Sequence, residues 1–144
     1  MKLNKIRELE IAKLPFDISK KCPESLIYND WVDFIEAHKF IWEEDTEAGK
    51  DALSGINNIP ESFRERVLLS LNKRTACLAF DDKKKQYKIL FTFRSELNYI
   101  GISIEGQLLT QDIKIFLEMA KHLDALLLKD GTTIIDEKML GIII

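Results

Sequence analysis

Residues 87–94, YKILFTFR, decide the fold class of this chain, because every second residue faces the same way and is apolar. The residues on that face are Tyr87, Ile89, Phe91 and Phe93. Strand-like runs also lie on either side of this segment, RTACLAF at residues 74–80 and YIGISI at residues 99–104. Because the links DDKKKQ and SELN are too short for a parallel crossover, the pattern predicts a three-stranded antiparallel meander.

Helical periodicity surrounds this meander. The clearest stripe lies within residues 30–42 and consists of Trp31, Phe34, Ile35, His38, Ile41 and Trp42. After the meander, Thr110 is a suitable N-cap for a long helix that we expect to run to about Leu128. Apolar spacing predicts shorter helices within residues 1–14, 47–56 and 60–72.

The C-terminal region returns to a strand-like composition, with TTIID at residues 132–136 and LGIII at residues 140–144. A chain of 144 residues is close to the commonest domain size, so we predict a single domain over residues 1–144. Its predicted class is α+β, with a helical N-terminal half packed on a mainly antiparallel sheet. The sheet would comprise the three-stranded meander, covered by the long helix, and a C-terminal strand or hairpin.

Composition restricts the function. Hydrophobic residues make up 46% and charged residues 31% of the chain, as expected for a small soluble globular protein. The formal net charge of −3 disfavours nucleic-acid binding, which usually requires a basic face. No apolar run reaches the roughly 20 residues of a membrane span. Cys22 and Cys77 have no metal-binding spacing, which favours reduced thiols and a cytoplasmic location.

Motifs for catalysis are missing from the sequence, which contains no GxSxG, GxGxxG or GxxxxGK[ST]. An enzyme is therefore less favoured, although His38 or His122 acting with carboxylates stays an alternative. A small-molecule-binding module with an apolar cavity is a further alternative. The sequence indicates no cofactor.

Two sets of residues have some resemblance to metal ligands. Glu118 and His122 are four residues apart on the long predicted helix, so both side chains can face one ion. No further ligand accompanies them at a recognisable spacing, so we predict no metal site and keep this pair as a weak alternative. Asp81 and Asp82 precede three lysines, and this composition favours a charged hairpin tip over a Mg²⁺ site.

An acidic run, FIWEEDTEAGKD, occupies residues 40–51. Its aromatic and acidic residues are the candidate contacts with a partner: Trp42, Glu43, Glu44, Asp45 and Glu47. Clustered carboxylates accelerate association with a basic protein, and a large aromatic side chain can anchor the interface. The alternative interpretation is an ordinary solvated surface segment.

These observations favour a small protein-binding domain that acts through an acidic surface patch. The sharpest form of this hypothesis is a neutraliser of a basic toxin, of the kind that bacterial immunity proteins provide. The apolar C-terminal strand offers a second mode of association, because an exposed strand edge can pair with another copy of the chain. The residues that would form such a homodimer are Leu140, Ile142, Ile143 and Ile144.

Overall fold

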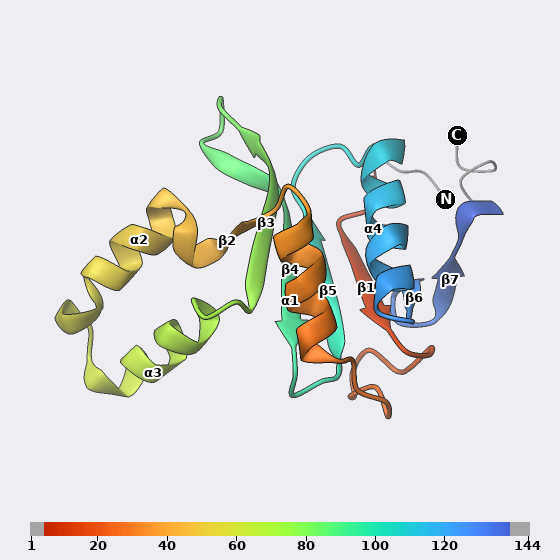
Figure 1. Ribbon diagram of the computed structural model, residues 1–144, viewed down its shortest axis with the longest axis horizontal. Helices are drawn as coiled ribbons and strands as arrows, with labels where there is room; N and C mark the ends of the chain where they lie inside the picture. Colours follow the sequence, from red (N-terminus) through yellow and green to blue (C-terminus); the bar gives the residue numbers. More distant parts are fainter. Residues whose placement is uncertain (1–4, 139–144) are drawn as a thin grey trace.

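The computed structural model describes residues 5–138, in which seven strands form one antiparallel sheet in the order β2-β3-β4-β5-β1-β6-β7 (Figure 1). The strands are β1 (Glu8–Ala12), β2 (Ile41–Trp42), β3 (Thr75–Asp81), β4 (Gln86–Arg94), β5 (Tyr99–Ile104), β6 (Leu126–Lys129) and β7 (Thr133–Ile135). The helices are α1 (Tyr28–Ala37), α2 (Glu47–Ser54), α3 (Glu61–Ser70) and α4 (Thr110–His122), with 3₁₀ turns η2 (Glu43–Asp45) and η3 (Ile56–Asn58).

The strands β3, β4 and β5 are consecutive antiparallel neighbours, as the alternation predicts. Phe91 on β4 lies opposite Ala76 on one side and Ile102 on the other. All three side chains are buried, and they form one apolar face of the sheet. Side chains that alternate along a pleated strand reach the same face, which makes this register visible in the sequence.

The predicted arrangement around the meander is wrong, because the N-terminal half contributes strands to the sheet as well as helices. The predicted helix within residues 1–14 is instead β1, which lies between β5 and β6. Leu9 and Ile11 face the helices, while Glu10 and Ala12 face the opposite side, and all four are buried. A strand covered on both faces shows little polar alternation, so its sequence resembles a helix.

The long helix also ends earlier than predicted, at His122 rather than near Leu128. Asp124 has a left-handed backbone with φ of 51°, and the chain then turns into β6, which pairs with β1. Ile41 and Trp42, predicted as a helix end, form the short edge strand β2 beside β3. The structure is therefore a seven-stranded sheet with helices, still broadly α+β, instead of a three-stranded meander with a separate C-terminal hairpin.

The C-terminal prediction can be followed only in part. Residues 133–135 form β7, which pairs with β6 around a turn at residues 130–132. The residues predicted to form the homodimer edge, Leu140, Ile142, Ile143 and Ile144, lie outside the described residues.

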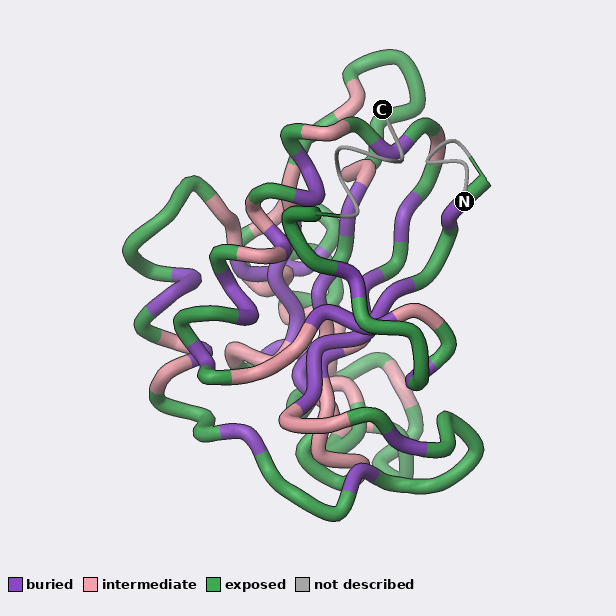
Figure 2. The backbone as a smooth tube through the Cα atoms, turned by 90° about the vertical axis from the view of Figure 1, so that its right-hand side faces the viewer, coloured by how far each residue is buried: buried purple, intermediate pink, exposed green. Residues whose placement is uncertain are grey.

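Helices α1 and α4 cover one face of the sheet and enclose the main core (Figure 1). Trp31 and Phe116 are fully buried there, at centroid distances of 5.9 Å from Phe93 and 5.5 Å from Phe91, respectively. On the opposite face, Phe16 and Cys22 form a smaller cluster with Ala12 of β1 and Leu128 of β6. The central strands are accordingly buried along most of their length (Figure 2).

Residues 43–73 form an arm that extends from the β2–β3 edge of the sheet (Figure 1). We use the term arm for this segment, which contains η2, α2, η3 and α3. Helix α2 packs mainly on η2 and η3, and α3 packs mainly on η3. The two helices predicted at residues 47–56 and 60–72 are therefore present, but the sheet is not their main support.

Candidate functional site

The base of the arm is fixed by the backbone of Lys73. The Lys73 carbonyl accepts hydrogen bonds from Tyr28 Oη and Trp31 Nε1, each at 3.1 Å. The Lys73 N–H donates to Glu44 Oε2 at 2.6 Å, and its Nζ lies 3.4 Å from Glu36 Oε2. Both chain segments that enter the arm are thus bound to each other and to α1, and this defines the direction in which the arm projects.

A second contact orients α2 on η2. Thr46 is the N-cap of α2: its Oγ1 accepts from Gly49 N at 3.0 Å and donates to the Glu43 carbonyl at 2.6 Å. A side chain at Gly49 would overlap the Glu43 carbonyl, so only glycine permits this close approach. Glu47 falls in the first turn of α2, where its charge is favourable to the helix dipole.

The predicted contact residues differ in their exposure. Trp42 is only 7% exposed and packs edge-to-face on Trp31, with ring centroids 5.8 Å apart. Glu43 and Glu44 are half-buried, whereas Asp45 and Glu47 are exposed. The acidic run therefore lies at the base of the arm, where Asp45 and Glu47 are its more accessible carboxylates.

Burial perturbs the groups around Glu43. Desolvation raises the pKa of the Glu43 carboxyl; a hydrogen bond from Thr75 opposes this shift, and the nearby Glu44 charge adds to it. Burial, with the charges of Glu43 and Glu44, also raises the pKa of the Cys77 thiol to about 12. Because the thiolate is the reactive form of cysteine, this raised pKa disfavours a nucleophilic role for Cys77.

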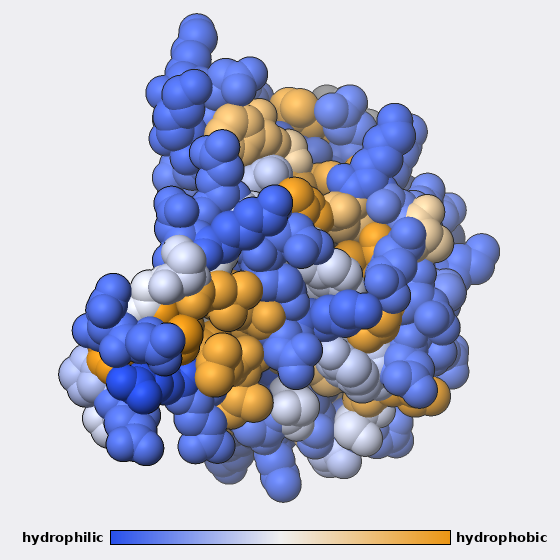
Figure 3. All heavy atoms as spheres, turned by 60° about the vertical axis from the view of Figure 1, so that its left-hand side comes forward, coloured by the Kyte–Doolittle hydropathy of each residue, from blue (hydrophilic) through white to orange (hydrophobic). Residues whose placement is uncertain are grey.

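Apolar side chains of α3 are exposed on the arm. Phe63 is 51%, Leu68 is 48% and Leu69 is 56% exposed. Figure 3 turns the arm toward the reader and shows apolar side chains at its surface. Full burial of a side chain of this type contributes roughly 1.5–3 kcal/mol, so covering these exposed side chains of α3 would be favourable. Leu68 and Leu69 are sequence neighbours, and Phe63 lies on another side of the helix. Exposed apolar side chains rimmed by polar residues are typical of interaction surfaces.

The negative charge of the chain is also concentrated on the arm. Between Glu43 and Lys73 there are seven acidic and four basic residues, which gives a formal charge of −3. The whole chain has the same formal charge of −3, so the remainder is formally neutral. The arm thus combines an exposed apolar surface with the net charge of the molecule.

The sequence pattern does not single out the exposed residues of α3. The helix expected within residues 60–72 has one apolar face, formed by Phe63, Val67 and Leu71, and this face does not include Leu68 or Leu69. Those two leucines lie outside this face on a helix that advances about 100° per residue. The sequence feature that could have revealed them is this pair of leucines, which lies outside the apolar face of the expected helix.

Both histidines lie next to the ring of Phe34. The His38 ring stacks on Phe34 with a centroid distance of 4.0 Å, and the His122 ring is 5.5 Å from the same ring. Both histidines are exposed, and His38 Nδ1 lies 2.8 Å from the Phe34 carbonyl. Within residues 5–138 no group of three potential His, Cys, Asp or Glu ligands surrounds a common point, so Glu118 and His122 have no third ligand there.

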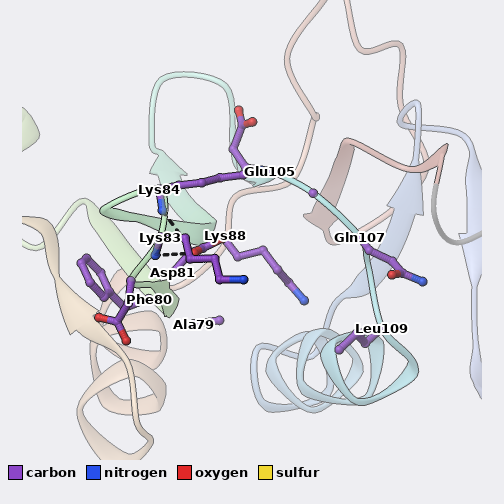
Figure 4. A pocket seen from close by; sticks show the side chains of 11 residues that line it. Ala79, Phe80, Asp81, Lys83, Lys84, Lys88, Glu105, Gln107 and Leu109 are labelled. Carbon is purple, nitrogen blue, oxygen red and sulfur yellow. Dashed lines mark hydrogen bonds between the residues drawn. The ribbon is translucent and has the colours of Figure 1, made fainter.

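A hollow of about 620 Å³ lies between the β3–β4 hairpin tip and the loop that leads into α4 (Figure 4). Its charged lining consists of Asp81, Asp82, Lys83, Lys84, Lys88 and Glu105. Asp81 Oδ1 accepts from the N–H groups of Lys83 and Lys84 at 2.9 and 3.3 Å. Asp81 therefore stabilises the hairpin turn, and the balanced charges of the lining select neither a cation nor an anion.

The strand β1 contains a buried carboxylate. Glu10 on β1 is 5% exposed, and its Oε1 accepts from Gly131 N at 2.6 Å. Burial raises the pKa of Glu10; the Gly131 N–H opposes the shift, and the charges of Asp130 and Glu8 add to it. This contact fastens the β6–β7 turn to β1.

Glu10→Gln should become more stable relative to wild type as the pH rises from about 4 to about 7. Burial raises the pKa of Glu10 in the folded protein above its value in the unfolded chain. The stabilisation from the protonated carboxyl is therefore complete below the unfolded-state pKa and is lost as the pH rises through the folded-state pKa. Glutamine keeps an acceptor for Gly131 N without the charge. Urea unfolding across this pH range measures the difference.

Two variants accompany that measurement. Glu10→Ala should cost about 1–3 kcal/mol, because the buried Gly131 N–H loses its acceptor. Glu8→Gln removes a charge from an exposed position of the same strand. A difference in unfolding free energy between Glu10→Gln and wild type that stays constant with pH, or that equals the difference for Glu8→Gln, would contradict a raised pKa of Glu10 in the folded protein.

Comparison of the chain with protein-family models, with curated proteins and with solved structures finds no significant match. Among residues 5–138, none of the helices has the length and apolar character needed to span a membrane.

Proposed function

We propose that this chain is a protein-binding domain whose arm docks on a partner with a basic surface. The observation that carries the proposal is the arm itself, which holds the net charge of −3 and exposes Phe63, Leu68 and Leu69. Neutralisation of a basic toxin in the cytoplasm, as bacterial immunity proteins do, is the specific form of this activity that we favour. A negatively charged surface of this kind accelerates encounter with such a partner and repels acidic proteins.

Within this proposal the acidic residues have different roles. Asp45 and Glu47 are exposed and attract the partner, while Glu44 holds the base of the arm through Lys73 N. Trp42 supports the arm from the core, because little of its ring is available for contact. The anchoring role expected of an aromatic residue falls to the exposed side chains of α3.

The geometry supports binding better than it supports the alternatives. His38 and His122 contact the apolar ring of Phe34, and the hollow of Figure 4 is lined by neither histidine. Nucleic acid would meet the negative charge of the arm, so it is a poor partner for this surface. Homodimerisation through the C-terminal strand would show as a concentration-dependent mass in sedimentation and is testable independently of the arm.

The double variant Asp45→Lys/Glu47→Lys should slow association with the partner about tenfold at about 50 mM salt, because it removes the electrostatic attraction. The difference should shrink at about 300 mM salt, where surface charges are screened. The partner is first purified from the source cells by affinity to the wild-type chain, and association rates are then measured by surface plasmon resonance.

The matched control is Glu24→Lys/Glu105→Lys, which changes the charge equally at exposed positions outside the arm. Both double variants should keep the melting temperature within about 4 °C of wild type, since the substituted residues are at the surface. Equal association rates for the arm variant and the control variant would rule out the arm as the electrostatic docking surface.

A further inference from the structure

Helix α3 presents two different sides. Val67 and Leu71 lie on its more buried side, since Val67 is half-buried and Leu71 is 8% exposed. At about 100° per residue, a second group of residues gathers on the opposite side of the helix. That group consists of Glu61, Glu65, Leu68 and Leu69, all exposed. We call it the outer face of α3.

The outer face is apolar at one end and acidic at the other. Leu68 and Leu69 lie near the C-terminal end of the helix, and Glu61 and Glu65 occupy its N-terminal part. Within residues 5–138 neither glutamate forms an ion pair, and the Arg64 guanidinium donates to the carbonyls of Ile59 and Asn57. Both carboxylates are therefore available to the cations of a partner.

We infer that the outer face of α3 docks an apolar protein surface that is flanked by lysine or arginine side chains. Leu68 and Leu69 supply the contact that excludes water, and Glu61 and Glu65 pair with the flanking cations. This inference rests on the proposed function and deepens it, because it moves the centre of the interface from the acidic run to α3.

Charge complementarity selects this occupant over the other candidates. A second copy of the chain would bring together two arms that each have a formal charge of −3, which is unfavourable. Anionic lipid and nucleic acid meet the same repulsion from an arm of formal charge −3. A basic protein with an apolar patch can bury Leu68 and Leu69 and can form ion pairs with Glu61 and Glu65.

The first experiment places a photo-reactive benzoylphenylalanine at position 68 or 69 of the full chain and irradiates it in lysate of the source cells. Position 109 is the control, since Leu109 is 39% exposed and lies outside the arm. The expected result is a protein adduct at positions 68 and 69 that is absent at 109, with lysine or arginine beside the cross-linked residue. No adduct, equal adducts at all three positions, or an acidic cross-linked segment would overturn the inference.

The second experiment measures calorimetric affinity for the purified cross-linked protein. Leu68→Ser/Leu69→Ser should weaken binding at least tenfold at any salt concentration, and Leu109→Ser should leave it unchanged. Glu61→Lys/Glu65→Lys should weaken it about tenfold at about 50 mM salt and less at about 300 mM. Arg66→Glu, at the edge of the outer face, should strengthen binding, a gain that misfolding cannot produce.

The two proposals fail separately. If Asp45→Lys/Glu47→Lys weakens binding while the leucine variant binds as wild type does, the inference about the outer face of α3 is wrong, but the proposal that the acidic arm binds a basic partner remains. If neither variant changes binding, both proposals are wrong. Circular dichroism of the leucine variant should match wild type, because both leucines are exposed and contribute little to the arm's own packing.

Discussion

Gly131→Ala is expected to destabilise the fold by about 2–5 kcal/mol, measured as a lower urea midpoint. Gly131 has φ of 75°, a left-handed conformation that costs an alanine roughly 1–2 kcal/mol. A Cβ there would also lie 2.6 Å from the Phe16 carbonyl oxygen, so the backbone would have to shift. Such crowding adds about 1–3 kcal/mol. The shift would also strain the hydrogen bonds that Gly131 makes to Glu10 and Phe16.

Gly106→Ala separates these two causes. Gly106 also has a left-handed backbone, with φ of 96°, but a Cβ there would meet nothing within 4 Å. We expect it to cost only the conformational part, about 1–2 kcal/mol. If the two alanine variants lose equal stability, the close approach of Gly131 to Phe16 does not contribute to folding.

The same contacts explain why β1 could not be predicted. Its central residue, Glu10, is charged, and the spacing of Leu3, Ile6 and Leu9 fits a helix. Glu10 is accommodated in the sheet because Gly131, 121 positions later, donates a hydrogen bond to it. No local pattern contains that partner, whereas the alternation from Tyr87 to Phe93 lies within one segment and could be seen directly.

The other missed elements have similar causes. LLLK at residues 126–129 follows a helix and consists largely of a good helix former, so its conversion into β6 depends on pairing with β1. The acidic run could be located in the sequence, but the burial of Trp42 depends on its contact with Trp31. The outward position of Leu68 and Leu69 becomes evident only when α3 is seen to leave the sheet.

Asp112→Ala is the second substitution with a large expected effect, about 3–5 kcal/mol. Asp112 Oδ2 lies 2.6 Å from Lys88 Nζ and accepts from Leu109 N at 2.9 Å. The side chains of Asp112 and Lys88 are only 6% and 19% exposed. Alanine would leave a largely buried ammonium without its partner carboxylate and the start of α4 without its cap. Urea unfolding measures the loss.

The second step of this experiment removes the cation as well. Lys88→Met should restore part of the stability of Asp112→Ala, because a buried unpaired charge costs more than an apolar side chain at the same position. Glu96→Ala breaks the exposed Arg74–Glu96 pair, whose atoms are 2.8 Å apart, and should cost less than about 1 kcal/mol. An equal loss from the buried and exposed pairs, or no recovery with Lys88→Met, would show that α4 is held by its apolar face alone. Since Lys88 lies on β4 and Asp112 on α4, recovery would identify this ion pair as the polar link that fixes the helix on the sheet.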